Sequence, residues 1–199
     1  MKVETTAVLI VGGGGAGLTA SMLLAGLGIE SLLVSALPGT SILPKAHVLN
    51  QRTMEILGDA GVAEQIYARS TPAENMKAMG WYAGFSGPEP EYGRRIGKVE
   101  SWGHGCENLN WVQASACRSA NLPQIRLEPI MKAHAEALNP GRVRFHHELL
   151  TLEQDEQGVE ACIRNPDVID VGRAGNSASE ANGEASEEAG SVMTPGLHW

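Results

Sequence analysis

Residues 7–17 read Ala7-Val8-Leu9-Ile10-Val11-Gly12-Gly13-Gly14-Gly15-Ala16-Gly17, an apolar run that passes directly into glycines. The apolar part is short, continuous and rich in branched side chains, which is typical of a strand buried on both faces of a parallel sheet. The glycines end this strand, and residues 18–27 are small and apolar enough to form a helix packed tightly on the sheet. Gly28 would stop that helix, and residues 31–34 resume the strand pattern. The stretch therefore predicts a right-handed strand-helix-strand unit and an α/β fold.

The glycines match the G-x-G-x-x-G fingerprint of a Rossmann-like dinucleotide-binding unit. Gly12 permits the tight turn, Gly14 lets the backbone approach a pyrophosphate, and Gly17 allows close packing of helix on strand. Free backbone N–H groups at the positive end of the helix would bind the pyrophosphate without a charged side chain. A glycine-rich surface turn is the weaker interpretation, since it would not need such apolar flanks. The candidate cofactor-binding residues here are Gly12, Gly13, Gly14, Gly15, Ala16 and Gly17.

Ser35 stands at the end of the second strand, where such units usually carry an acidic residue that binds the ribose hydroxyls. A serine hydroxyl can make one such hydrogen bond but lacks the two charged acceptors of a carboxylate. We include Ser35 among the cofactor-binding residues and expect weaker binding of the adenosine half. An NAD(P)-binding protein that tolerates a 2′-phosphate is a further alternative, although no basic residue lies immediately beside Ser35.

The rest of the chain alternates between helical and strand patterns. We expect a loop between Pro38 and Pro44, helices at 50–57, after 63 and at 121–138, a strand at 143–145 and a hairpin within 149–163. Between 71 and 117, Gly, Pro, Trp and Tyr interrupt short apolar stretches, which favours strands and long loops of a second, β-rich layer. Residues 1–164 are thus predicted as one domain. Residues 165–199 are rich in Gly, Ala, Ser, Asn and Glu, and we expect a disordered, low-complexity acidic tail.

Charge and composition exclude several classes of protein. The formal net charge of −8 includes six acidic side chains and one arginine in residues 165–199, which leaves the folded part nearly neutral and without a basic cluster. Nucleic acid and anionic membranes are therefore not expected as partners. The glycines within 7–29 argue against a signal peptide or a membrane span. Three scattered cysteines favour a reducing, cytoplasmic location, and neither they nor the histidines have the spacing of a metal site.

Residues 44–57, Pro44-Lys45-Ala46-His47-Val48-Leu49-Asn50-Gln51-Arg52-Thr53-Met54-Glu55-Ile56-Leu57, resemble the class A FAD-dependent aromatic hydroxylases, especially the phenol and 2,4-dichlorophenol hydroxylase branch. A second matching block is Leu122-Pro123-Gln124 with Leu127-Glu128-Pro129. Together with the glycines, these blocks extend the resemblance over about residues 5–164. The resemblance implies a flavoprotein in which NAD(P)H reduces FAD and one atom of O2 is transferred to a phenolic or polyketide-like aromatic substrate.

The resemblance also implies three further flavin-site residues. Lys45 stands where the family usually has an arginine, a change that keeps the charge but loses the planar bidentate group. Arg52 matches an arginine of the family pattern, and Gln124 matches its flavin-contacting residue. On composition alone, Arg52 would be a solvated helix arginine and Gln124 an ordinary polar residue at a helix start.

Two later family motifs, an Asp-Gly strand end and a Gly-Asp segment that holds the flavin, do not occur in this sequence. We therefore expect a chain truncated relative to the family, with part of the flavin site and of the substrate layer missing. One alternative to an active monooxygenase is thus an inactive flavoprotein fragment. Another is a partner subunit, either in a homo-oligomer or beside a chain that supplies the missing half.

Overall fold

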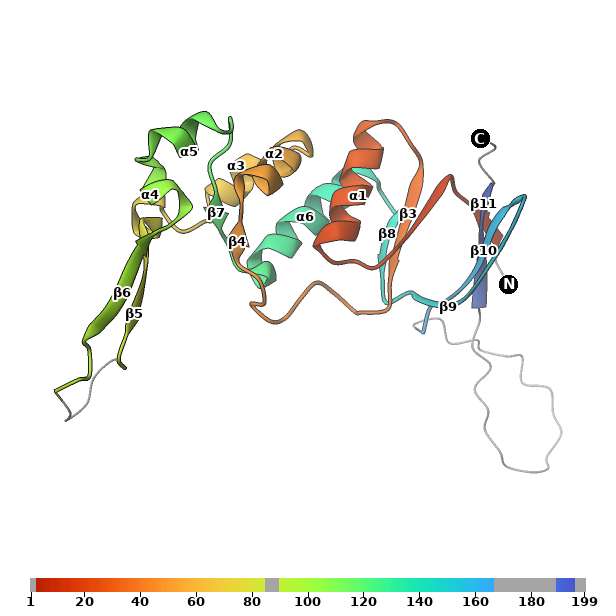
Figure 1. Ribbon diagram of the computed structural model, residues 1–199. Helices are drawn as coiled ribbons and strands as arrows, with labels where there is room; N and C mark the ends of the chain where they lie inside the picture. Colours follow the sequence, from red (N-terminus) through yellow and green to blue (C-terminus); the bar gives the residue numbers. More distant parts are fainter. Residues whose placement is uncertain (1–2, 85–89, 167–188, 196–199) are drawn as a thin grey trace, which may run out of the picture. The chain divides into compact units, whose positions relative to one another are not determined.

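The computed structural model describes residues 3–84, 90–166 and 189–195 (Figure 1). The chain divides into two compact units. Unit 1 comprises Met1–Ile42 and Met131–Trp199, and unit 2 comprises Leu43–Ile130. Helix α6, Gln124–Leu138, is continuous through the boundary and contains Pro129. Residues 71–117, which the sequence predicts as the start of a second layer, all lie in unit 2.

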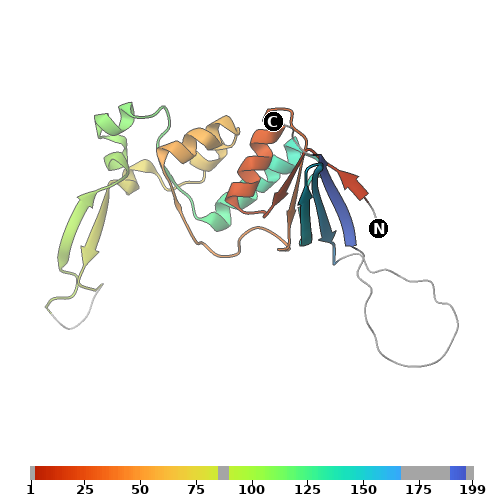
Figure 2. The same ribbon diagram turned by 45° about the vertical axis from the view of Figure 1, so that its right-hand side comes forward.

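The predicted strand-helix-strand unit forms the centre of unit 1. Strands β2 (Val8–Val11), β3 (Ser31–Ser35) and β8 (Val143–Phe145) make a parallel sheet in the order β2-β3-β8. Helix α1 (Gly15–Gly26) joins β2 to β3 and packs on both (Figures 1 and 2). The α/β fold with a parallel sheet is therefore confirmed, and α1 begins inside the glycine run rather than after it.

The core of unit 1 explains why this part of the sequence is so apolar. Every residue of β3, the central strand of its sheet, is buried. Leu18 and Met22 of α1 are fully buried as well, which fixes the face that the helix turns inward. A second cluster of buried side chains comprises Leu32, Val34 and Ile163. The partly buried Leu9 and Leu149 pack against it. Removing these apolar side chains from water stabilises the sheet that presents the glycine run.

A second sheet in unit 1 has the order β1-β11-β10-β9. Its strands are β1 (Val3–Thr5), β9 (Glu148–Asp155), β10 (Gly158–Arg164) and β11 (Ala189–Pro195). The antiparallel hairpin β9-β10 is the one that the sequence predicts. The expectation of a structureless tail is wrong for Ala189–Pro195, which pair parallel to β1 and antiparallel to β10. Main-chain pairing on both sides orders this segment, and composition does not encode it. Most other tail residues lie outside the described part of the chain.

Unit 2 consists of short helices and two antiparallel strand pairs. Its elements before α6 are β4 (Val48–Leu49), α2 (Gln51–Asp59), α3 (Ala63–Tyr67), a 3-10 helix (Ala73–Met76), β5 (Ala78–Tyr82), β6 (Arg95–Glu100), α4 (Trp102–Cys106), α5 (Leu109–Gln113) and β7 (Ala120–Asn121). Strand β4 pairs with β7, and β5 pairs with β6. The sequence predicts α2, α3 and strands within 71–117. It does not predict α4 and α5, because helices this short show no clear periodicity.

Within the part of the chain that the structure describes, no helix combines the length and the apolar character needed to cross a membrane.

Candidate functional site

The glycine turn between β2 and α1 is shaped by backbone contacts that exclude side chains. Gly12 has a φ of +114°, a conformation that residues with a Cβ rarely adopt, and its N–H donates to the Val34 carbonyl at 2.8 Å. A Cβ on Gly17 would overlap the carbonyl oxygen of Gly12. Gly17 is therefore required where helix and strand meet, as the fingerprint predicts.

The N-terminus of α1 offers backbone donors to an anion. Its N-cap is Gly14, which has no side chain to accept from the first turn, and no acidic residue lies in that turn. Gly15 and Ala16 are the first residues of the helix, and a Cβ on Gly15 would meet no heavy atom within 4 Å. Open space, free N–H groups and the positive end of the helix dipole fit a pyrophosphate.

Gly13 and Ser35 lie side by side at the carboxyl edge of the sheet. A Cβ on Gly13 would come within 2.5 Å of the Phe145 ring and 3.0 Å of the Ser35 Cβ. Ser35 is the last residue of β3 and is 6% exposed, and its carbonyl accepts from the His147 N–H at 2.9 Å. The structure therefore places Ser35 beside the glycine turn, at the strand end where dinucleotide-binding units usually carry an acidic residue.

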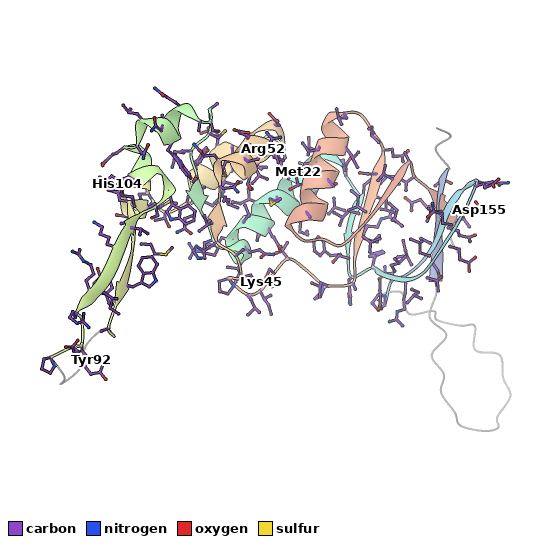
Figure 3. All side chains as sticks on the ribbon, viewed as in Figure 1. Met22, Lys45, Arg52, Tyr92, His104 and Asp155 are labelled. Carbon is purple, nitrogen blue, oxygen red and sulfur yellow. The ribbon has the colours of Figure 1, made fainter. Side chains whose placement is uncertain are left out.

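In unit 2, the structure brings Lys45 and Gln124 together. The backbone N–H of Gln124 donates to the carbonyls on both sides of Lys45, those of Pro44 and Ala46, each at 2.9 Å. Lys45 itself has a φ of 43°, in the left-handed region, and its side chain is exposed (Figure 3). The loop that carries Lys45 is thus fixed on the N-terminus of α6.

Strand pairing fastens the same junction further along. Val48 pairs with Asn121 in the β4-β7 ladder, and the Leu122 N–H donates to the His47 carbonyl at 2.8 Å. The His47 Nδ1 and Asn121 Oδ1 atoms are 2.9 Å apart. The segment 44–57 and the block that begins at Leu122, which resemble the family separately in the sequence, therefore pack against each other at this junction.

The side chain of Gln124 is oriented by Glu128, a residue that the sequence analysis did not single out. The Gln124 Nε2 donates to Glu128 Oε1 at 2.5 Å, and Glu128 is 2% exposed. The available signal was their spacing of four residues on a predicted helix, since such pairs share a face. With its amide group held by Glu128, Gln124 keeps its carbonyl oxygen for other partners.

Arg52 does not join the junction of Lys45 and Gln124. It lies on α2, and its side chain is 76% exposed and paired with Glu55 at 2.8 Å. Figure 3 shows Arg52 and Lys45 on separate elements, with side chains that do not point toward one another. The hydrogen bond from Ser115, more than that from Arg52, lowers the pKa of Glu55. Within unit 2, Arg52 is thus a surface arginine in a local ion pair.

No group of three or more His, Cys, Asp or Glu residues within the described ranges could hold a metal ion. Unit 1 presents backbone N–H groups at the start of α1, and unit 2, taken by itself, presents Lys45 and the Gln124 amide. Donors of this kind suit a phosphate-bearing organic cofactor.

Comparison with known proteins gives the same result. The family model described as FAD binding domain matches residues 5–170. A 2,4-dichlorophenol 6-monooxygenase from Delftia acidovorans is 40% identical over 161 residues, which cover 80% of this chain and 26% of that enzyme. A phenol 2-monooxygenase from Pseudomonas sp. (strain EST1001) is 36% identical over 165 residues, 82% of this chain and 26% of that enzyme.

Among solved structures, the flavin-dependent monooxygenase PieE in complex with FAD and substrate superposes with a TM-score of 0.76 and 34% identity. The match covers 96% of this chain and 29% of that chain. The chain thus spans about a quarter of the length of the curated relatives it matches. The glycine turn, the parallel sheet and these similarities lead to one conclusion: the chain belongs to the FAD binding domain family of flavoprotein monooxygenases.

Proposed function

We propose that the chain contributes the FAD-binding unit and part of the substrate layer of a monooxygenase that hydroxylates a phenolic or polyketide-like aromatic compound with NAD(P)H and O2. The observation that carries the proposal is the 40% identity to a 2,4-dichlorophenol 6-monooxygenase. The backbone of the Gly12–Gly17 turn supports it, because Gly12 has a positive φ and a Cβ on Gly13 or Gly17 would overlap neighbouring atoms, as expected of a dinucleotide fingerprint.

FAD would supply the redox chemistry, accepting electrons from NAD(P)H and delivering one oxygen atom of O2 to the ring. The residues of this chain would bind and orient it. The N–H groups at the start of α1 would hold the pyrophosphate, and Ser35 would donate or accept one hydrogen bond at the ribose. Because Ser35 replaces a carboxylate, we expect a looser hold on the adenosine half than an acidic residue would give.

Lys45 and Gln124 would act together in unit 2. The two carbonyls that accept from the Gln124 N–H fix the backbone on either side of Lys45, so its side chain projects from a defined Cα position. An exposed lysine on a fixed loop can bind an anionic group of the cofactor at little entropic cost beyond its own side chain. Arg52 stays in the proposal as a residue that the family pattern marks, held by Glu55.

Flavin binding by the full 199-residue chain is the first test. FAD is titrated into the purified protein and followed by its visible absorbance and by quenching of its fluorescence. We expect saturable binding of one FAD per chain. A colourless protein that added FAD does not restore would overturn the proposal.

Lys45→Ala tests the role of the unit 2 junction. We expect FAD affinity to fall roughly tenfold, the usual loss for a charge-assisted hydrogen bond. Lys98→Ala on β6 is the matched control, because it removes an exposed lysine of unit 2 outside the junction. Equal affinities of the two variants would exclude Lys45 from the site.

The hydroxylase reaction needs a separate measurement. Oxidation of NAD(P)H by the FAD-loaded chain is followed with and without phenol or 2,4-dichlorophenol. Stimulation by the phenol supports the full activity, whereas tight FAD binding with no stimulated oxidation rejects activity of this chain alone. In the second case, size-exclusion chromatography shows whether the chain associates with itself.

We place the reaction in the cytoplasm, where Cys117 and Cys162, both free thiols here, stay reduced.

A further inference from the structure

Unit 2 contains a cavity of about 700 Å³ that has no part in the proposed flavin site. Its lining comes from the start and end of α2, from α3 and from the segment from α5 to Arg118 (Figure 1). Lys45, Arg52 and Gln124 do not line it. The volume lies within the range of small-molecule sites.

Three hydrogen bonds build the walls of this cavity. The Gln51 Nε2 donates to the Trp111 carbonyl at 2.9 Å, which ties α2 to α5. The Ser115 hydroxyl donates to Glu55 at 2.5 Å and accepts from the Cys117 N–H at 3.0 Å. Side-chain hydrogen bonds, rather than a strand ladder, therefore hold α5 and the segment after it against α2.

A cation is fixed at one side of the cavity. The Arg118 guanidinium lies 4.2 Å from the centre of the Tyr67 ring, and the Tyr67 hydroxyl donates to the Arg118 carbonyl at 2.8 Å. Burial raises the pKa of Tyr67, which keeps the phenol neutral and able to donate. No carboxylate in the described part of the chain pairs with Arg118. Stacking on the ring leaves the N–H edge of the guanidinium available for an anion.

Trp111 contributes a second donor to the lining. Trp111 lines the cavity, and its indole N–H is shielded from solvent without a hydrogen-bond partner among the described residues. A shielded donor without a partner is costly, and an acceptor bound in the cavity would relieve that cost if the indole turns toward it. Three apolar side chains also line the cavity: Ala63, Val112 and Ala116.

We propose that this cavity binds a small organic carboxylate with an apolar body, its carboxylate on Arg118 and the Trp111 indole N–H and its body against Tyr67 and the apolar wall. Glu64, an exposed residue of α3, is the acidic side chain of the lining and opposes the anion weakly through solvent. The site is independent of flavin binding, so the inference stands or fails separately from the proposed function.

Phenylacetate is the probe, and phenylacetamide, its uncharged isostere, is the matched ligand control. Each is titrated into the 199-residue chain labelled with 15N, and the indole N–H resonance of Trp111 is followed by NMR, assigned from its loss in Trp111→Phe. We expect a saturable downfield shift with phenylacetate and an affinity for phenylacetamide at least tenfold lower, since the charge-assisted contact is lost.

Variants locate the site. Arg118→Gln and Trp111→Phe should each weaken phenylacetate binding roughly tenfold, because each removes a hydrogen bond to the carboxylate. Arg69→Gln, which removes a nearby arginine outside the lining, should leave the affinity unchanged, and Glu64→Gln should raise it about twofold. Equal affinities for the two probes, an unmoved Trp111 resonance, or an unchanged affinity in Arg118→Gln each overturn the proposal.

Discussion

The glycine turn of unit 1 and the Lys45 junction of unit 2 are built in opposite ways. The turn uses neighbours in the sequence, Gly12 to Gly17, and its shape depends on the absence of side chains at Gly13 and Gly17. The junction joins segments far apart in the chain, since His47 and Asn121 are 74 positions apart, through strand pairing and hydrogen bonds. A single added methyl group should therefore damage the turn, whereas the junction and its neighbours should lose stability in small steps.

Gly17→Ala should have the largest effect of the changes considered. The added Cβ would overlap the backbone carbonyl of Gly12, which cannot move without disturbing β2. We expect a loss of about 3 kcal/mol in the free energy of unfolding, measured with urea, together with loss of FAD binding. Gly26→Ala is the control on the same helix, because its Cβ would meet no heavy atom within 4 Å. The two variants having equal stability would show that the turn tolerates a side chain.

Asn50→Ala should have an intermediate effect. The Asn50 side chain caps α2 by accepting from the Thr53 N–H at 2.8 Å, whereas α1 begins at a glycine with no capping side chain. We expect a loss of about 1 kcal/mol, measured by urea unfolding. Asn50→Ser should recover most of that loss, since a serine hydroxyl can accept the same bond. If Asn50→Ala is as stable as the parent chain, α2 does not depend on its cap.

The pKa of Glu55 tests the smallest of these effects, the hydrogen bonds that this carboxylate accepts from Ser115 and Arg52 in unit 2. Hydrogen bonds from Ser115 and then from Arg52 lower this pKa from 4.5, so the charged carboxylate favours the folded state. The stabilisation that the charged Glu55 gives to the folded state is therefore fully present above pH 4.5. It is lost as the pH falls through the lowered pKa of Glu55 in the folded state. NMR titration of the Glu55 carboxyl carbon measures it.

Ser115→Ala should raise the pKa of Glu55 more than Arg52→Ala does, because the serine is the larger cause. The reverse order would mean that the surface arginine, rather than the segment after α5, controls this carboxylate.

Sequence patterns predicted those helices, strands and turns whose formation depends on residues close together in the chain. The run of Val8–Val11 into glycines was sufficient for the sheet, helix α1 and the role of Gly17, and the Gly158 turn was sufficient for the β9-β10 hairpin. The order β2-β3-β8 and the pairing of β4 with β7 depend on contacts between distant segments, which no local pattern encodes.

The residues of the candidate site divide in the same way, into those that a local pattern identifies and those that depend on distant contacts. The glycines and Ser35 were identified from spacing, and Lys45, Arg52 and Gln124 only from a resemblance. That Gln124 holds the loop of Lys45, and that Glu128 holds Gln124, became visible only in three dimensions. The cavity beside Arg118 had no sequence signal, because its walls combine α2, α3 and α5 in a way that hydrophobic periodicity does not report.

Gly13 and Phe145 lie far apart in the sequence but side by side in the fold, since a Cβ on Gly13 would come within 2.5 Å of the Phe145 ring. The two positions therefore constrain each other's evolutionary history. A side chain at residue 13 becomes tolerable only after the ring at residue 145 has become smaller, and a smaller residue at 145 leaves a gap that a side chain at 13 can fill. A substitution at residue 145 followed by one at residue 13 is therefore accessible, whereas the reverse order is blocked.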